Sequence, residues 1–165
     1  MSLDDDIARL KIQEEFVQFT HFDEQDAWNL GGAMRAEAVA RKLPLVIDLR
    51  VAGRKLFYTA LGGTVPDNHN WVERKINVVN RLHKCSYRVG RELAKSGKAL
   101  NEAQGFLPID YATHGGSFPI TIQNVGVVGT ITVSGIPQRD DHNFVVEQIC
   151  KYLKLDYAAI ALALE

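Results

Sequence analysis

The stretch that decides the fold is Leu45-Val-Ile-Asp-Leu-Arg-Val51, which is followed by Ala52-Gly53 and then by Lys55-Leu-Phe-Tyr-Thr-Ala-Leu61. Positions 45, 47, 49 and 51 are apolar and alternate with Val46, Asp48 and Arg50. A period of two is typical of a β-strand, and Ala-Gly supplies a turn. The sequence therefore predicts a β-hairpin between residues 45 and 63.

A second hairpin is predicted further along the chain. Ile120 and Ile122 alternate with polar residues, residues 124–126 turn the chain, and residues 128–134 return. Gly129 lies inside the returning strand, where a glycine indicates a bulge or the close approach of another backbone segment.

Helical patterns surround the two hairpins. Apolar residues at spacings of three and four predict helices over about residues 4–19, 24–42, 67–96 and 140–153. Asp23 is expected to cap the second helix and Asp140 the last one. Because the strands come in antiparallel pairs instead of alternating singly with helices, we expect one α+β domain over residues 1–165, with two N-terminal helices and an antiparallel sheet covered by helices. This order speaks against a parallel nucleotide-binding sheet.

Composition and charge narrow the class of protein. The chain has 165 residues, of which 46% are hydrophobic and 24% charged, with a net charge of -1. A domain of this size buries a substantial core, and the overall charge gives it no reason to bind nucleic acid or an anionic membrane. Charges are nevertheless segregated: residues 1–26 carry eight acidic and two basic side chains, whereas residues 71–98 carry two acidic and eight basic ones.

The cysteines and the N-terminus predict a cytoplasmic protein. Cys85 and Cys150 lie far apart and outside any Cys-x-x-Cys or zinc-ligand pattern, so neither a disulfide framework nor a metal site is expected. The N-terminus lacks the basic start and apolar run of a signal peptide, and eighteen consecutive apolar residues occur nowhere.

The predicted helix over residues 67–96 carries a basic face and two exceptions to it. On a helical wheel, one polar arc holds Arg74, Asn77, Arg81, Lys84, Arg88, Arg91 and Lys95. This arc is either a solvated face or a surface that pairs with the acidic N-terminal helix of the same or another subunit. Lys75 and His83 project into the apolar arc, where each needs a polar partner. Lys75 either extends its ammonium past the apolar edge or serves a ligand, and His83 is either a hydrogen-bonded core residue or a ligand residue.

Two further stretches are candidates for a site. His114-Gly115-Gly116-Ser117 precedes the second hairpin, and its glycines either permit a tight turn or let backbone amides approach a ligand, while His114 could bind a metal, haem iron or a carboxylate. The second stretch begins at Ser134 and ends at Asp141-His142. Asp141 faces the positive end of the predicted last helix, and His142 is expected to be neutral and to serve a ligand or a neighbouring loop.

Known catalytic patterns are missing from the sequence. Neither Ser117 nor Ser134 occupies a Gly-x-Ser-x-Gly elbow, no phosphate-binding glycine loop occurs, and no His-x-x-x-His pair lies on a helix. We therefore assign no catalytic residue and no metal ligand.

Three stretches together resemble a known family. They are Pro66-Asp-Asn-His-Asn-Trp-Val-Glu-Arg-Lys-Ile-Asn-Val-Val-Asn-Arg81, His114-Gly-Gly-Ser-Phe-Pro-Ile120 and Val128-Gly-Thr-Ile-Thr-Val-Ser-Gly-Ile-Pro-Gln-Arg-Asp-Asp-His142. In this order they are similar to a family of uncharacterised bacterial and fungal proteins within the haem-degrading HbpS/GlcG-like group. The resemblance implies a profilin-like α+β fold, dimers that build larger assemblies, and in some members binding of haem or another small ligand. The matching positions are Trp71, Arg74, Lys75, Asn77, His114, Gly115, Gly116, Phe118, Pro119, Ser134, Gly135, Asp141 and His142.

Two hypotheses about function follow. The first is a cytoplasmic homo-oligomer that binds a small molecule, with haem as the ligand that the resemblance suggests and with a site drawn from Arg74, Lys75, His83, His114, Gly115, Gly116, Ser134, Asp141 and His142. The second is a structural or adaptor protein that acts through its assembled surface. This second hypothesis rests on the apolar C-terminal stretch that begins at Leu155, which we expect a neighbouring subunit to bury.

Overall fold

The computed structural model describes residues 2–163. Its elements, in chain order, are α1 (Leu3–Phe16), α2 (Glu24–Ala40), β1 (Val46–Val51), β2 (Arg54–Ala60), α3 (Pro66–Leu82), α4 (Ser86–Ser96), the short 3-10 turn η1 (Glu102–Gln104), β3 (Ser117–Ile122), β4 (Gly126–Ser134) and α5 (Gln138–Leu153). Among these residues, no helix is both long and apolar enough to cross a membrane.

Both predicted hairpins are present and join into one antiparallel sheet. The strand order is β2-β1-β4-β3, so β1 of the first hairpin pairs with β4 of the second at the centre of the sheet. Gly129 lies opposite Val51 in this pairing, and a Cβ atom at Gly129 would lie 2.0 Å from the carbonyl oxygen of Arg50. The close backbone approach predicted for Gly129 is therefore confirmed.

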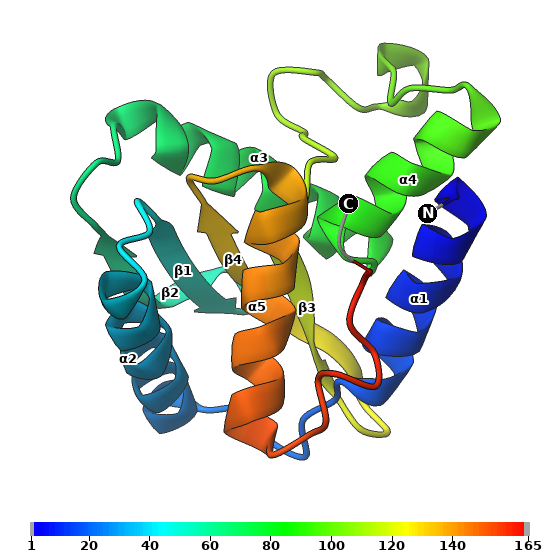
Figure 1. Ribbon diagram of the computed structural model, residues 1–165. Helices are drawn as coiled ribbons and strands as arrows, with labels where there is room; N and C mark the ends of the chain where they lie inside the picture. Colours follow the sequence, from blue (N-terminus) through cyan, green and yellow to red (C-terminus); the bar gives the residue numbers. More distant parts are fainter. Residues whose placement is uncertain (1, 164–165) are drawn as a thin grey trace.

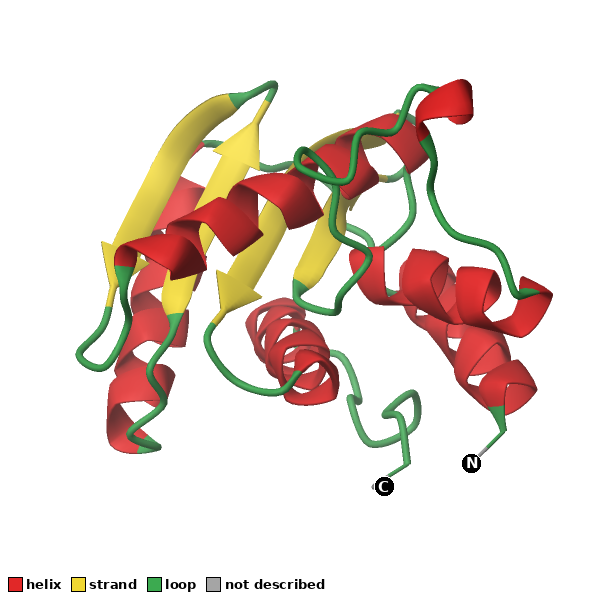
Figure 2. Ribbon diagram, turned by 90° about the horizontal axis from the view of Figure 1, so that it is seen from above, coloured by secondary structure: helices red, strands yellow, loops and turns green. Residues whose placement is uncertain are grey.

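Helices cover both faces of this sheet, which confirms the predicted α+β class. Figure 1 shows α2 and α5 side by side in front of the strands, with α1 and α4 beyond the β3 edge. Seen from above, α3 lies across the opposite face (Figure 2). Alternation along β1 explains the two layers: Ile47 and Leu49 enter the main core, whereas Val46 packs with Val72 and Ile76 of α3.

The helix predicted over residues 67–96 is two helices, so that prediction was wrong in one respect. His83 ends α3 with a left-handed backbone (φ +53°), and α4 begins at Ser86 on a new axis. Because the wheel of α3 stops at Leu82, His83 does not project into an apolar arc but is exposed at the helix end. The physical reason is that α3 packs on the sheet whereas α4 packs on α1.

The residues of the predicted polar arc have different partners in α3 and in α4. In α4, Arg88 pairs with Glu14 and Lys95 with Asp4, so the predicted alternative of pairing with the acidic N-terminal helix is confirmed within one chain. In α3, Arg74, Asn77 and Arg81 donate hydrogen bonds to backbone carbonyls between residues 104 and 111 and so hold that irregular segment.

One of three predicted helix ends is confirmed, and two differ from the prediction. Asp23 caps α2 as predicted, accepting from the backbone N–H groups of Gln25 and Asp26. The first helix ends at Phe16 instead of residue 19, since Phe19 forms a bridge with Ile122 beside β3. Asp140 does not cap α5: the capping position is Pro137, whose side chain accepts no hydrogen bond.

The C-terminal stretch is covered by its own chain, which corrects the expectation that another subunit buries it. Within the described residues, Ile160 and Leu162 are each 4% exposed. Arg9 donates to the carbonyl of Ala159, and Gln13 to that of Ile160, at 2.9 Å each. The stretch up to residue 163 therefore packs along α1 and no longer argues for assembly.

Candidate functional site

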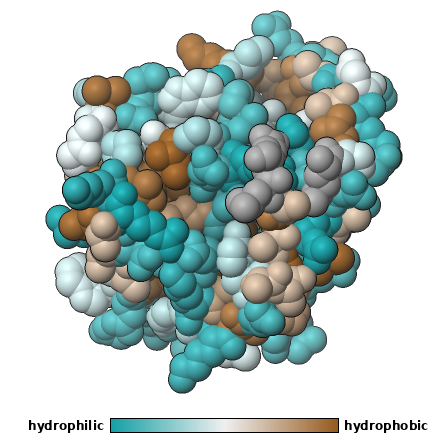
Figure 3. All heavy atoms as spheres, viewed as in Figure 1, coloured by the Kyte–Doolittle hydropathy of each residue, from teal (hydrophilic) through white to brown (hydrophobic). Residues whose placement is uncertain are grey.

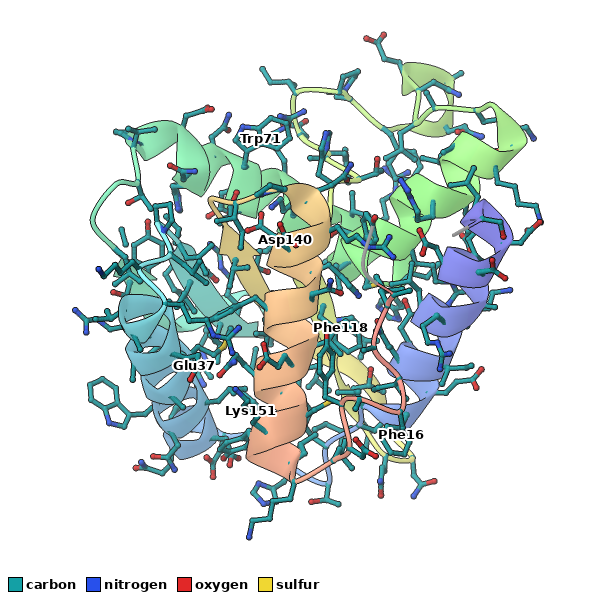
Figure 4. All side chains as sticks on the ribbon, viewed as in Figure 1. Phe16, Glu37, Trp71, Phe118, Asp140 and Lys151 are labelled. Carbon is teal, nitrogen blue, oxygen red and sulfur yellow. The ribbon has the colours of Figure 1, made fainter. Side chains whose placement is uncertain are left out.

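A cavity of about 260 Å³ lies where α3, the end of β4 and the start of α5 meet. Figure 4 shows Trp71 of α3 above the end of α5 that carries Asp140. The residues that line the cavity are Asn68, Trp71 and Lys75 from α3, His114 from the loop before β3, Ser134, Gly135 and Ile136 from the end of β4 and the turn after it, and Gln138 and Asp141 from α5. Three stretches distant in sequence, residues 68–75, residue 114 and residues 134–141, thus contribute to one cavity.

The polar wall of this cavity is a buried ion pair. Lys75 Nζ lies 2.8 Å from Asp141 Oδ2, and the two side chains are 3% and 2% exposed. The ammonium also donates to Ser134 Oγ at 3.3 Å and to the carbonyl oxygen of Val133 at 3.2 Å. The second carboxylate oxygen of Asp141 accepts from the backbone N–H of Ile136. The polar partner that the sequence analysis predicted for Lys75 is therefore the carboxylate of Asp141 in the same chain.

Burial weakens the charged forms of both members of the pair. Desolvation lowers the pKa of Lys75, although the nearby Asp141 opposes it. Desolvation likewise raises the pKa of Asp141 to about 6, against the attraction of Lys75 and the hydrogen bonds that Asp141 accepts. The pKa values of the two groups are therefore closer together than in water, so that transfer of a proton from Lys75 to Asp141 costs less free energy than it does in water.

An aromatic and cationic rim borders the pair. The rings of Trp71 and His114 meet edge to face, with centroids 4.8 Å apart, and the guanidinium of Arg74 lies 4.7 Å from the Trp71 ring centre. Partial burial lowers the pKa of His114, and the charges of Lys75 and Arg74 lower it further. The imidazole is therefore neutral at pH 7, exposed, and able to offer a nitrogen lone pair.

Glycines let the surrounding loops come close enough to form the cavity. A Cβ atom at Gly115 would lie 2.0 Å from the carbonyl oxygen of Gln138, and one at Gly116, where φ is +126°, would lie 2.8 Å from Lys75 Nζ. The close approach at this glycine pair is to α5 and to Lys75 of the same chain. A side chain at Gly115 would clash with the backbone of α5, and one at Gly116 would clash with the ammonium of Lys75.

The structure brings together most of the predicted site residues, but not all. Lys75, His114, Ser134 and Asp141 line the cavity, and Arg74 lies beside it, where Arg74 and His114 also line a second hollow of about 370 Å³. His83 lies at the far end of α3 and lines neither hollow.

His142 is also absent from the lining of both hollows. It is 1% exposed, its Nε2 lies 2.8 Å from Gln13 Oε1, and its ring packs beside Tyr87. Complete burial lowers its pKa to about 3, so it is neutral as predicted. His142 therefore acts as a hydrogen-bonded core histidine at the α5–α1 contact.

Five lining residues escaped the candidate set drawn from the sequence: Asn68, Trp71, Gly135, Ile136 and Gln138. Trp71 and Gly135 were among the matching positions of the resemblance, and the position of Trp71 four residues before Lys75 on one helix places both on the same face. Asn68, Ile136 and Gln138 were not among those positions, and Asn68 and Gln138 join the site only because α3, the end of β4 and the start of α5 meet in the folded chain.

A second cluster has the chemistry of metal ligands but is already occupied by hydrogen bonds. One ligand atom each of His21, Asp23 and Asp26 lies within 4.8 Å of the others. Asp23 and Asp26 form the capping box of α2, and Asp26 also accepts from Tyr152 at 2.6 Å. This cluster therefore closes a helix start and gives no reason to assign a metal.

The fold and the cavity define the class of protein: a profilin-like α+β sandwich in which the cavity between α3, β4 and α5 has a buried ion pair in its wall and an exposed histidine at its border. The chain belongs to the family described as haem degrading protein HbpS-like, whose family model matches residues 22–150. This confirms the resemblance found in the sequence.

Relatives with similar sequences bear the name UPF0303 protein. One from Acidobacterium capsulatum is 52% identical over 162 residues, which is 98% of each chain, and one from Rhizobium meliloti is 46% identical over 98% of this chain and 99% of its own.

Solved structures agree with the fold. The Ybr137w protein matches with a TM-score of 0.80 and 28% identity over 90% of this chain and 87% of its own. HbpS matches at 0.63 and 20% identity, covering 82% and 92%, and a PduOC–haem complex at 0.66 and 16%, covering 78% and 93%. At their level of identity, the last two support the shared fold alone.

Proposed function

We propose that this protein binds haem at the mouth of the cavity, with His114 as the ligand of the iron. The observation that carries the proposal is the neutral, exposed imidazole of His114 beside the Trp71 ring and the Arg74 guanidinium. Iron in haem accepts a neutral imidazole, and its propionates pair with arginine. Membership of the HbpS-like family supports haem as the ligand to test first.

The residues at the rim of the cavity can contact one edge of a haem group but cannot enclose the whole macrocycle. Lys75 is engaged by Asp141, so the cation left to meet a propionate is Arg74, which already donates to the carbonyl oxygens of Pro108 and Tyr111. A cavity of about 260 Å³ leaves most of a macrocycle outside, against Trp71. Bound haem would supply redox chemistry at its iron, while this chain supplies the imidazole, the aromatic surface and the cation.

Titration with haemin tests the proposal. We expect a saturable Soret shift in the unaltered protein and its loss, or at least about a tenfold weaker affinity, in His114→Asn, since a tenfold change corresponds to about 1.4 kcal/mol. His83→Asn is the matched control, because His83 is an exposed histidine outside the cavity and asparagine tolerates its left-handed backbone. Equal shifts in the two variants, or no saturable shift in any protein, would contradict the proposal.

We also propose self-association through the β2 edge of the sheet. Within the described residues β2 pairs only with β1, so its outer edge presents free backbone groups, a feature that favours pairing with another chain. Trp28 of α2 is 67% exposed and packs edge to face on Phe57 of β2. On the face shown in Figure 3, by contrast, apolar residues are scattered among hydrophilic ones.

Light scattering on Trp28→Glu tests this second proposal. We expect the mass to fall by at least one subunit relative to the unaltered protein. Val125→Glu is the control, because Val125 is 72% exposed but lies in the turn between β3 and β4. A monomeric mass for the unaltered protein, or identical masses for both variants, would contradict association at β2.

A further inference from the structure

Lys75 differs from an ordinary buried ion-paired lysine in its surroundings. Its ammonium does not lie within close-packed apolar side chains but forms part of the wall of the 260 Å³ cavity. It also approaches Gly116, where one added carbon would lie 2.8 Å from Nζ. The amine is thus excluded from bulk water and yet faces a hollow large enough for a small metabolite.

The contacts of Nζ are unequal. The bond to Asp141 is short, at 2.8 Å, whereas those to Val133 and Ser134 are 3.2 Å and 3.3 Å. Two weak hydrogen bonds are easily exchanged for a ligand, while the carboxylate stays in place through its second oxygen, which accepts from Ile136 N–H. The nitrogen can therefore turn toward the cavity without losing its carboxylate neighbour.

Amine nucleophiles need a way to lose and regain a proton. Burial lowers the pKa of Lys75 and raises that of Asp141, so the difference between the two acids is smaller than in water and proton transfer across the 2.8 Å contact becomes accessible. Neutral Lys75 then carries a lone pair beside the hollow.

We propose that Lys75 condenses with the carbonyl group of a small aldehyde or 2-oxo acid to form an iminium linkage in this cavity, with Asp141 as its proton partner. The ammonium gives one proton to Asp141, and the neutral amine adds to the carbonyl carbon. The carbonyl oxygen leaves as water after taking one proton from the attacking nitrogen and one from Asp141. The balance is one ammonium and one carbonyl compound converted into one iminium and one water, and the iminium remains paired with the Asp141 carboxylate.

The other cavity residues favour a carbonyl compound that carries an acceptor group such as a carboxylate. Asn68 and Gln138 each bring a side-chain amide, and His114 brings a ring nitrogen. The first turn of α5 also begins here without a side-chain cap, which favours negative charge at its start. This inference concerns the wall of the cavity and does not depend on haem binding at its mouth.

Trapping with pyruvate and sodium cyanoborohydride at pH 7 tests the inference on the native, unaltered protein. We expect one carboxyethyl group per chain, and peptide mapping is expected to place it on Lys75 at an occupancy at least about tenfold above that of exposed lysines such as Lys151. Lactate, which has the same carboxylate but no carbonyl group, should give no adduct. An adduct absent from Lys75, or no more frequent there than on Lys151, would overturn the proposal without recourse to any variant.

Variants separate reactivity from structure. Lys75→Arg keeps the positive charge opposite Asp141 but cannot form the iminium, so we expect the specific adduct to disappear while thermal unfolding remains cooperative. Lys84→Arg is the control, because Lys84 is also ion-paired, to Glu92 at 2.7 Å, but lies outside the cavity. Asp141→Asn should slow trapping, since asparagine cannot accept the proton, and should shift the pH optimum of trapping downward, since Asp141 no longer raises the pKa of Lys75. Trapping at an unchanged rate in Asp141→Asn would overturn the role of Asp141.

Discussion

Replacing Lys75 by methionine should destabilise the protein substantially, because it leaves Asp141 buried and charged without its partner. Both side chains are at most 3% exposed, and removing one member of a buried pair typically costs about 3–5 kcal/mol in the free energy of unfolding. The double variant Lys75→Met/Asp141→Leu should recover part of this loss, since an apolar pair of similar volume needs no desolvation. About 1–3 kcal/mol remains, because the Ile136 N–H then lacks its acceptor.

The cost of Lys75→Met should also depend on pH. Lys75 lowers the pKa of Asp141, so without it the pKa of the folded protein lies above the present value of about 6 and well above the unfolded value near 3.8. A carboxyl group whose pKa is raised by folding binds protons better when folded, and its unfavourable effect therefore grows as pH rises through the interval between the two values. Because the pKa of Asp141 is also raised to about 6 in the unaltered protein, the deficit of the variant relative to that protein should be smaller at pH 5 than at pH 8.

Urea unfolding followed by tryptophan fluorescence at pH 5 and pH 8 measures both effects. The unaltered protein, the two single variants and the double variant form one thermodynamic cycle. The reasoning is refuted if Lys75→Met loses less than about 1 kcal/mol at pH 8, or if its loss is the same at both pH values.

Two further outcomes are expected. Gly129→Ala should lower the free energy of unfolding by at least about 2 kcal/mol, because the new carbon would lie 2.0 Å from the Arg50 carbonyl oxygen. Gly62→Ala is the control and should change this free energy little, because a carbon added there has no atom within 4 Å. Equal effects of the two substitutions in urea unfolding would contradict the close approach. His142→Gln should make the free energy of unfolding less dependent on pH between 7 and 5. In the unaltered protein the folded pKa of about 3 lies below the unfolded value of 6.5, so stability is lost as pH falls through this interval, at up to about 1.4 kcal/mol per pH unit. Parallel pH profiles for the two proteins would contradict this expectation.

The hairpins and the second helix could be predicted because their signals are local. Alternation within residues 45–61 sets the faces of β1 and β2, and Asp23 lies three residues before Asp26 in a capping pattern. The break at His83 could not be predicted, since no glycine or proline marks it and a left-handed histidine is chosen by the separate packing of α3 and α4.

In the candidate site, too, local signals could be predicted from the sequence, whereas contacts between distant residues could not. The sequence indicated that Lys75 needs a partner and that Asp141 lies at a helix start, but their pairing joins residues on two helices that meet only in the folded chain. Histidine alone was a poor guide: His114 reaches the cavity, His83 is exposed elsewhere, and His142 is buried against α1.

The strand order β2-β1-β4-β3 has a consequence for the folding rate. Each hairpin can form from neighbouring residues, but an isolated two-stranded hairpin is only marginally stable in water. The central pairing of residues 46–51 with residues 129–134 closes a loop that contains α3 and α4, and contacts so distant in sequence are slow to form. We therefore expect the docking of β1 on β4 to limit the rate of folding, and substitutions at this seam to slow refolding more than they accelerate unfolding.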